Sequence, residues 1–304
     1  MIKVTNVSKW YGIVVGINRV SLSLEPGVTG LLGVNGAGKS TLLNLMGGLL
    51  KPSTGSVTVG NAPVFSNGKA IRKIGYCPSI DKFYEDLSGE AFVTYMGRLS
   101  GLTLDDARRR AKEALDEVAI GAEGQKKIRR MSKGMRQKVK MAQAIVHNPP
   151  ILLLDEPLNG MDPPSRATTI KLIRQWGAAG KCVMVSSHVL HEVEAMTSRI
   201  LLLHHGRLLA SGEVPEVREA IASRPLRISL RCADGRRLGA SLIAWPTVKS
   251  LEFGEDSKNL TIEVADASGF YAELGELMAN EDFGLEILNP LDDNLASVFQ
   301  YLVT

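Results

Sequence analysis

The sequence has few cysteines, few aromatic residues and no long apolar run. Its three cysteines, Cys77, Cys182 and Cys232, form no C-x-x-C pair, which suits a reducing compartment and argues against a disulfide framework or a cysteine metal site. Aromatic residues make up 5% of the chain, and no basic run is interleaved with them, so we expect no nucleic-acid partner. No apolar run approaches the ~18 residues of a membrane span, and the first residues show no apolar signal region.

The remaining composition is that of a folded globular chain with a slight basic excess. Hydrophobic residues make up 44% of the 304 residues and charged residues 22%, and the formal net charge is +4 at pH 7. This length is sufficient for a full core and for two domains. A weak positive charge allows contact with acidic membranes or partners, but it does not indicate nucleic acid.

A glycine-rich segment, GVNGAGKST at residues 33–41, fits the phosphate-loop pattern G-x-x-x-x-G-K-[ST]. The glycines let backbone N–H groups approach phosphate oxygens, and the lysine adds a charge for the β/γ-phosphates. An apolar run at 28–32 enters the loop and a segment with helical spacing leaves it, so a helix N-terminus faces the anion. The expected nucleotide-binding residues are Gly33, Val34, Asn35, Gly36, Ala37, Gly38, Lys39, Ser40 and Thr41, with the Ser40 hydroxyl also a ligand of Mg²⁺.

The segment ILLLDEP at residues 151–157 predicts a buried strand that ends in two carboxylates. Four apolar residues in a row are too few for a helix and suit a strand buried on both faces. An isolated Asp-Glu pair would equally suit a helix cap or a solvated turn. Beside a phosphate loop, however, we expect Asp155 to bind Mg²⁺ at the carboxyl end of the strand and Glu156 to be the base for an attacking water.

The order of predicted elements indicates two domains, 1–214 and 215–304. In the first, β-rich segments surround the phosphate loop, a helical region spans about 87–147, and strands then alternate with helices up to a last strand at 199–212. This alternation is typical of an α/β fold with a parallel sheet. The second domain has the order β-α-β-β-α-β, which predicts a small ferredoxin-like α+β unit followed by a helix through Phe299. We interpret it as an accessory or regulatory domain, because it contains no recognisable active site.

Further motifs follow in an order typical of one ATPase family. The segment MSKGMRQK (131–138) precedes the Asp155 strand, PLNGMD (157–162) follows it, and Ser187 and His188 end the strand that starts near Cys182. Residues 1 to about 215 therefore resemble the nucleotide-binding subunit of ATP-binding-cassette (ABC) transporters. The alternative is an unrelated phosphate-loop ATPase or GTPase. The resemblance implies a P-loop NTPase core of the ABC type, in which a parallel sheet carries an antiparallel β subdomain and a helical subdomain.

The resemblance also implies roles for residues outside the phosphate loop. Tyr11 falls where the family has an aromatic residue that stacks on adenine, although a core aromatic at a strand end is the alternative. Ser132 and Gly134 match the signature that reaches the γ-phosphate held by a second subunit. Asp162 matches the aspartate that lines the dimer seam. His188 matches a switch histidine that contacts the γ-phosphate and the attacking water; a purely structural histidine is the alternative.

The signature, the position of Ser79 and, mildly, the turn at Asp162 depart from the family pattern. Lys133 and Met135 replace a glycine and a glutamine of the signature, in a form similar to one exporter branch, and we do not interpret it as inactivation. Ser79 stands where the family usually has a glutamine that links Mg²⁺ and the attacking water to the permease interface. Serine is too short to span that gap directly, although a bridging water could do so. We expect activity to survive, and Asp81 is a candidate substitute for the glutamine.

The last residues, LDDNLASVFQYLVT (291–304), resemble the tail of ATPase subunits that pair with separate export permeases. The resemblance implies ATP and Mg²⁺ as ligands, with a transmembrane permease subunit and a second, identical or homologous, ATPase subunit as partners. It further implies a peripheral place on the cytoplasmic face of the plasma membrane and export of a drug, lipid, polysaccharide or ion. An importer ATPase, a permease-coupled machine without a transport task and an ABC ATPase acting on ribosomes or DNA are the alternatives.

Overall fold

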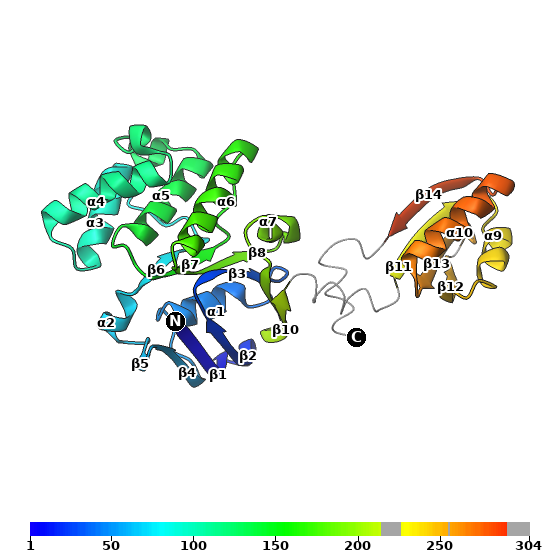
Figure 1. Ribbon diagram of the computed structural model, residues 1–304, viewed down its shortest axis with the longest axis horizontal. Coiled ribbons are helices and arrows are strands. Elements are labelled where there is room, and N and C mark those ends of the chain that lie inside the picture. The colour runs from blue at the N-terminus through cyan, green and yellow to red at the C-terminus, as the bar shows by residue number, and fades with distance from the viewer. Residues whose placement is uncertain (214–225, 255, 291–304) are drawn as a thin grey trace. The chain divides into compact units, whose positions relative to one another are not determined.

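The computed structural model describes residues 1–213, 226–254 and 256–290. The chain divides into two compact units, Met1–Val214 and Pro215–Thr304, both drawn in Figure 1. Among the described residues, no helix combines the length and apolarity needed to cross a membrane. The predicted helix through Phe299 and the tail motif at 291–304 lie outside the described residues.

The first unit contains two sheets. Their strands are β1 (Ile2–Tyr11), β2 (Val14–Leu24), β3 (Gly27–Leu32), β4 (Thr54–Val59), β5 (Ala62–Pro63), β6 (Ile74–Cys77), β7 (Ile151–Asp155), β8 (Cys182–Ser187), β9 (Arg199–His204) and β10 (Arg207–Glu213). One sheet has the order β2-β1-β4-β5 and is antiparallel, as the paired N-terminal strands predict. The other has the order β10-β9-β3-β8-β7-β6 and is parallel from β9 to β6.

Helices cover the parallel sheet on both faces. They are α1 (Lys39–Met46), α2 (Gly68–Ile71), α3 (Gly89–Leu99), α4 (Leu104–Glu117), α5 (Lys133–Ile145), α6 (Pro163–Ala178) and α7 (Leu190–Glu194), with short 3-10 turns η1 (Gly121–Glu123) and η2 (Ile128–Arg130). Figure 1 shows α3 to α6 on one side of this sheet, and α1 between its other side and the sheet of β1, β2 and β4. The unit therefore consists of stacked layers that bury most residues of the parallel strands.

Strand β7, which lies between β8 and β6, confirms the predicted burial on both faces. Leu152 and Leu154 pack in a core with residues of α3 to α6, whereas Ile151 and Leu153 pack in a core with α1 and the antiparallel sheet. All four side chains are at most 1% exposed. Because each fully buried leucine or isoleucine stabilises the fold by about 1.5–3 kcal/mol, this strand is a rigid support for the residues that follow it.

The helical region begins where the sequence supplies hydrogen-bonding caps. Ser88 accepts a hydrogen bond from the backbone N–H of Ala91 at the start of α3, and Thr103 accepts one from Asp106 at the start of α4. Ser132 caps α5 in the same way. Each cap satisfies a backbone donor that the first helical turn leaves free, which is typically worth ~1 kcal/mol.

One prediction is wrong: residues 199–212 do not form a single strand. They form an antiparallel hairpin of β9 and β10 in which His204 pairs with Arg207. Between these strands, His205 and Gly206 have φ values of 42° and 75°. Two successive residues with positive φ make a tight hairpin turn whose twist matches that of the strands. The sheet therefore carries an antiparallel edge strand in addition to its parallel strands.

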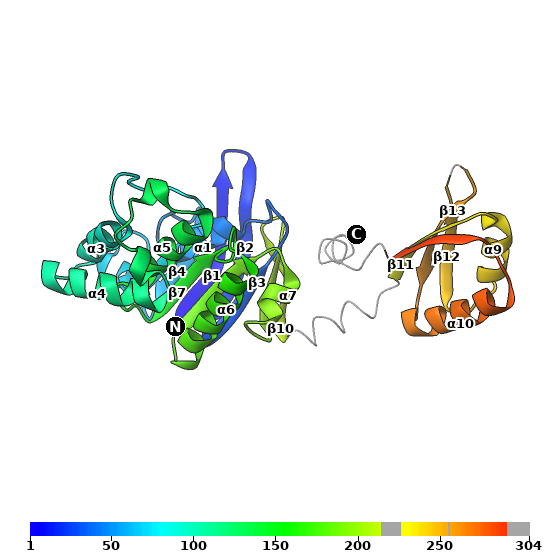
Figure 2. The same cartoon turned by 90° about the horizontal axis from the view of Figure 1, so that it is seen from above.

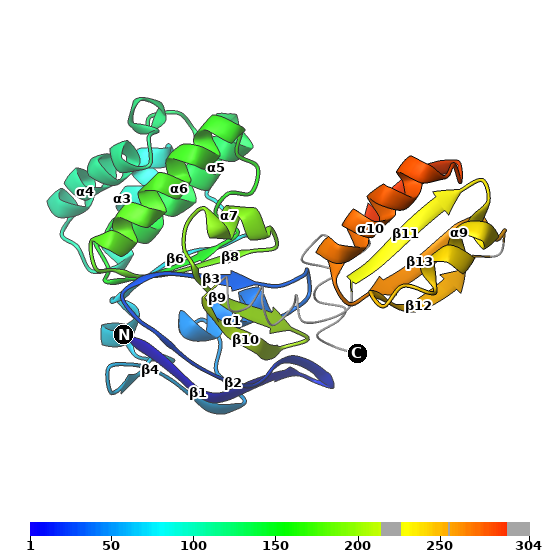
Figure 3. The same cartoon turned by 45° about the vertical axis from the view of Figure 1, so that its right-hand side comes forward.

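The second unit has the predicted order of elements. These are β11 (Leu226–Cys232), α9 (Gly235–Leu242), β12 (Val248–Phe253), β13 (Asn259–Val264), α10 (Ala267–Asn280) and β14 (Leu285–Pro290). The strands form an antiparallel sheet of order β12-β13-β11-β14, and Figure 3 shows α9 and α10 beside it. Leu238 from α9 and Phe270 from α10 share one core with strand residues such as Ile262. The ferredoxin-like classification stays a prediction.

His147 provides a test of how the first unit responds to pH. One ring nitrogen lies 3.2 Å from the carbonyl oxygen of Ile74, and burial lowers the pKa of His147 below its ordinary value. His147 is therefore protonated at a higher pH in the unfolded chain than in the folded chain. Its protonation lowers the free energy of unfolding as pH falls below about 6.5. We expect the urea midpoint of His147→Gln to fall less than that of the wild type between about pH 7.5 and about pH 5.5. An equal fall in the urea midpoint of the two proteins over this pH range would contradict this expectation.

Candidate functional site

A cavity of about 520 Å³ opens where the parallel strands of the first unit end. Its lining comes from the tip of the β1–β2 hairpin, the phosphate loop and the segments that follow β6, β7 and β8. The lining residues are Tyr11, Val14, Val15, Gly16, Val34, Asn35, Gly36, Ala37, Gly38, Lys39, Ser40, Thr41, Ser79, Glu156, Asn159 and His188. In Figure 2 the β1–β2 hairpin projects from the unit. The fold thus brings most of the predicted nucleotide-site residues to one cavity.

Two glycines shape the phosphate loop with backbone conformations that other residues rarely adopt. Gly36 and Gly38 have φ values of 83° and 105°, and a Cβ on Gly38 would lie 2.6 Å from the carbonyl oxygen of Gly16. Gly38 also precedes the first residue of α1, so the free N–H groups of that helix face the cavity. Such a loop offers backbone donors to an anion at close range.

Lys39 lies across this loop with its charge directed into the site. The side chain is buried, and Nζ donates hydrogen bonds to the carbonyl oxygens of Gly33 at 2.6 Å and Val34 at 3.3 Å. Nζ also lies 3.4 Å from Oε1 of Glu156. The ammonium group is therefore held by the loop on one side and by a carboxylate on the other, where an incoming phosphate can exchange with the carboxylate.

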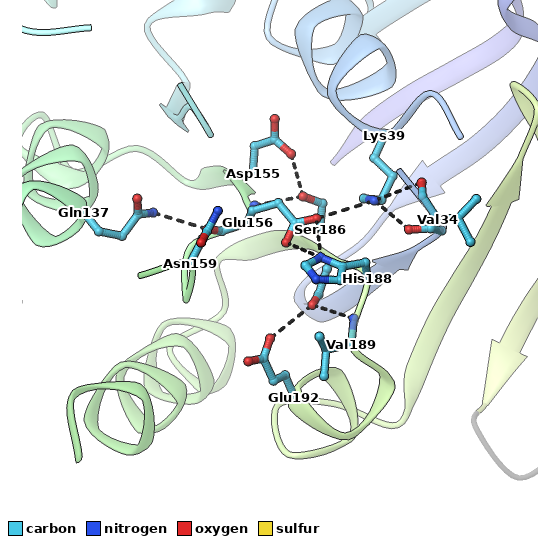
Figure 4. A network of polar contacts seen from close by, with 12 residues as sticks. Val34, Lys39, Gln137, Asp155, Glu156, Asn159, Ser186, His188, Val189 and Glu192 are labelled. Carbon is cyan, nitrogen blue, oxygen red and sulfur yellow. Dashed lines mark hydrogen bonds and ion pairs between the residues drawn. The ribbon is translucent and has the colours of Figure 1, made fainter. Parts of the chain in front are cut away.

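Glu156 is placed by a strained backbone and by contacts on both sides of its side chain. Its φ of 51° is left-handed, and its backbone N–H donates to Oγ of Ser186 at 2.9 Å. The carboxylate lies between Lys39 and His188, whose Nδ1 is 3.0 Å from Oε2 (Figure 4). A left-handed non-glycine residue costs about 1–3 kcal/mol and persists where its surroundings fix it, as often happens at functional sites.

Asp155 has one carboxylate oxygen with a partner and one without. Oδ1 accepts a hydrogen bond of 2.6 Å from Oγ of Ser186. Oδ2 is buried, and within the described part of the chain it has no hydrogen-bond partner. A buried charged oxygen without a partner is costly, so this site suits a hard cation that prefers oxygen ligands. Ser40 lines the cavity, and Asp155 directly precedes the lining residue Glu156, so the oxygen donors present fit Mg²⁺.

Strand β6 contributes no further reactive group beside this carboxylate. Burial and the nearby Asp155 raise the pKa of Tyr76 above its ordinary value. Burial raises the pKa of Cys77 to about 12. Both side chains are therefore protonated near neutral pH, and a thiolate nucleophile at Cys77 is not available to this site.

Five predicted residues lie outside the cavity lining: Gly33 and Asp155, which directly precede lining residues, and Ser132, Gly134 and Asp162, which lie further away in the sequence. Ser132 caps α5 by accepting from the N–H of Met135, and Asp162 caps α6 by accepting from the N–H of Ser165 at 2.9 Å. A Cβ on Gly134 would lie 3.4 Å from the carbonyl oxygen of Gly160, so the signature segment lies against the turn that leads to Asp162. Within one chain these residues do not line the nucleotide cavity.

One residue of the site, Ser186, was not predicted from the sequence. Ser186 holds both carboxylate positions, because its hydroxyl donates to Asp155 and accepts from the backbone of Glu156. The signal for it was weak, since a serine at the end of a strand has many ordinary uses. Asp81, considered as a substitute for the usual glutamine, is instead paired with the buried Lys140 at 2.6 Å and does not line the cavity.

Comparison with known proteins identifies the family. The family model described as ABC transporter matches residues 17–159. The linearmycin resistance ATP-binding protein LnrL of Bacillus subtilis (strain 168) is 35% identical over 214 residues, which cover 70% of this chain and 69% of LnrL. The daunorubicin/doxorubicin resistance ATP-binding protein DrrA of Streptomyces peucetius is 31% identical over 281 residues, covering 91% of this chain and 84% of DrrA.

The chain belongs to the ABC transporter family. Within it, the chain is an ATP-binding subunit, an ATPase that uses ATP and Mg²⁺, and the ABC-type P-loop fold predicted from the sequence is confirmed. The dimeric structure of MJ0796, a bacterial ABC transporter cassette, superposes with a TM-score of 0.65 at 27% identity, covering 70% of this chain and 99% of that one. A post-hydrolysis structure of the MJ0796 cassette bound to ADP and Pi has a TM-score of 0.65 at 26% identity, with the same coverage. Subunits of this family form dimers and work with transmembrane permeases.

Proposed function

We propose that this chain powers a separate membrane permease for export, and that Glu156 is the base of its ATPase reaction. The observation that carries the proposal is the position of the Glu156 carboxylate between the ammonium group of Lys39 and the imidazole ring of His188, beside the phosphate loop. This arrangement places a proton acceptor (Glu156), a cation that binds phosphate (Lys39) and the imidazole of His188 within reach of one reacting centre.

Different residues of the cavity have different roles in ATP hydrolysis. Lys39 and the loop N–H groups hold the β/γ-phosphates, and Tyr11, 47% exposed at the cavity edge, stacks on the adenine. Ser40 and the unpaired oxygen of Asp155 would hold Mg²⁺, which when bound neutralises phosphate charge. Glu156 accepts the proton of the attacking water, and His188 contacts the γ-phosphate from the other side.

A second ATPase subunit, identical or homologous, completes the site. The cavity of one chain does not include Ser132 or Gly134, yet the N-terminus of α5 and its capping serine are suited to an anion. We place these residues on the γ-phosphate bound by the partner, with Asp162 at the seam. ATP then shifts a population of open dimers toward the closed form, and hydrolysis releases it.

We further propose that this chain is the ATPase subunit of an exporter and lies on the cytoplasmic face of the membrane. The relatives LnrL and DrrA carry names that describe resistance to linearmycin and to daunorubicin and doxorubicin. We therefore favour export of a drug-like substrate over import, and we expect no nucleic-acid partner. The second unit, residues 215–304, is proposed to regulate or assemble the complex.

Affinity purification of the full chain from gently solubilised native membranes tests this proposal. We expect a multi-span permease to co-purify in stoichiometric amount and to be identified by mass spectrometry. The tagged Lys39→Ala chain is a matched control, because a permease held by the ATPase fold is retained when nucleotide binding is lost. Recovery of ribosomes or DNA without a permease would overturn the export proposal.

A further inference from the structure

Glu192 is a buried acid next to the site, and the reaction described above does not use it. It lies on α7, four residues after His188, and is 9% exposed. Each carboxylate oxygen has its own partner: Oε2 accepts from Oγ of Ser187 at 3.2 Å, and Oε1 lies 3.0 Å from Nη1 of Arg166. Buried carboxylates are retained where they are fully paired, so this one has a fixed position.

The first partner connects Glu192 to the backbone on both sides of His188. The Ser187 hydroxyl donates to Glu192 and accepts a hydrogen bond of 3.0 Å from the backbone N–H of Val189. The His188 side chain is 51% exposed. Its placement against Glu156 therefore depends on the backbone at residues 187 and 189, which this hydroxyl joins.

The second partner connects Glu192 to the turn that ends at Asp162. Arg166, in the first turns of α6, donates from Nε to the carbonyl oxygen of Met161 at 3.1 Å and from Nη1 to Glu192 at 3.0 Å. A guanidinium group has a rigid planar fork, so the carbonyl at 161 and the carboxylate at 192 are held at a fixed separation.

We propose that Glu192 is a positioning residue for His188, and that Arg166 couples this position to the turn at residues 159–162. The inference rests on the proposed role of His188. A shift of the turn moves the Met161 carbonyl, the Arg166 fork and the Glu192 carboxylate together, and the backbone around His188 follows. A change at the dimer seam beside Asp162 is thus transmitted to the γ-phosphate contact of His188 in the same chain. Glu192 does not line the nucleotide cavity, so its loss affects turnover and leaves ATP binding intact.

Single-turnover and steady-state ATPase measurements on the purified full chain test the inference. Glu192→Gln keeps the size of the side chain but removes the charge that holds Arg166. We expect kcat to fall about 10- to 100-fold, as for a displaced catalytic group, with KM for MgATP changed less than about twofold. In a His188→Ala background, adding Glu192→Gln is expected to change the single-turnover rate by less than about twofold, because both changes remove the same contact.

A matched control and three outcomes make the test decisive. Glu113→Gln removes a carboxylate that also pairs with arginines, but on the exposed face of α4, and is expected to leave kcat unchanged. Wild-type kcat in Glu192→Gln would overturn the inference and leave the proposed function standing. Losses that multiply in the double variant, with a lowered unfolding temperature, would show that Glu192 only stabilises the fold and would overturn it too. Full activity in His188→Ala would instead overturn the role of His188 itself.

Discussion

Replacing Glu156 by glutamine is expected to reduce ATP hydrolysis by about 10²- to 10⁴-fold while ATP binding persists. The amide keeps the size of the side chain and can still approach His188, but it cannot accept a proton from water. It also removes the negative charge that lies 3.4 Å from Nζ of Lys39. Phosphate then competes with no carboxylate for the lysine, so affinity for MgATP is expected to be maintained or increased.

The measurement is steady-state phosphate release alongside equilibrium binding of MgATP and the mass of the complex in solution. We expect Glu156→Gln to bind ATP and to accumulate as an ATP-bound dimer, because closing proceeds and opening by hydrolysis does not. Glu90→Gln is a suitable control, since Glu90 lies on α3, accepts a hydrogen bond from the side chain of Gln125 and does not line the cavity. Turnover at the wild-type rate in Glu156→Gln would remove Glu156 from the role of base.

The parts of the site that the sequence predicted are those encoded locally. The phosphate loop is a single run of nine residues, and the strand that ends at Asp155 is recognisable from its apolar run. These features require only short-range rules, namely glycine at positive φ, a helix that starts after the loop and a strand buried on both faces. The structure places their side chains in or next to one cavity, as the rules require.

The parts that could not be predicted depend on contacts between distant segments or on an unusual backbone. Nothing in the sequence distinguishes Glu192 from other acidic residues on helices, and only the fold reveals Arg166 as its partner. The hairpin at His205 was missed because His-Gly is not one of the preferred residue pairs for a two-residue hairpin turn, and the apolar residues on both sides resemble one continuous strand. Strand β6 was also missed, because four residues that include a glycine give little periodicity.

The signature residues show a different limit. Ser132 and Asp162 are both explained, within one chain, as helix caps. A capping serine and an anion-binding serine have the same local geometry, because each places an oxygen beside free N–H groups at a helix start. Their roles across a dimer remain predictions of the family resemblance, and a partner subunit is required to distinguish the two uses.

Replacing Lys39 by alanine is expected to weaken MgATP binding about 10- to 150-fold, which corresponds to the loss of one charged hydrogen bond of about 1.5–3 kcal/mol. The change removes the buried cation that phosphate would contact. It also leaves the carbonyl oxygens of Gly33 and Val34 without the donor that holds the loop in shape. The loss is therefore expected in the dissociation constant itself, measured by calorimetry, and not only in turnover.

A lysine elsewhere in the same unit separates this effect from a general loss of stability. Lys181 also donates from Nζ to a backbone carbonyl, that of Pro149 at 2.8 Å, and to the side chain of Asn148 at 2.7 Å, but it does not line the cavity. Lys181→Ala is expected to lower the unfolding temperature without changing the affinity for MgATP. Unchanged affinity in Lys39→Ala would contradict the phosphate-loop assignment. If Lys39→Ala loses affinity and Glu156→Gln loses only turnover, then nucleotide binding and hydrolysis in this cavity depend separately on two side chains that form an ion pair with each other.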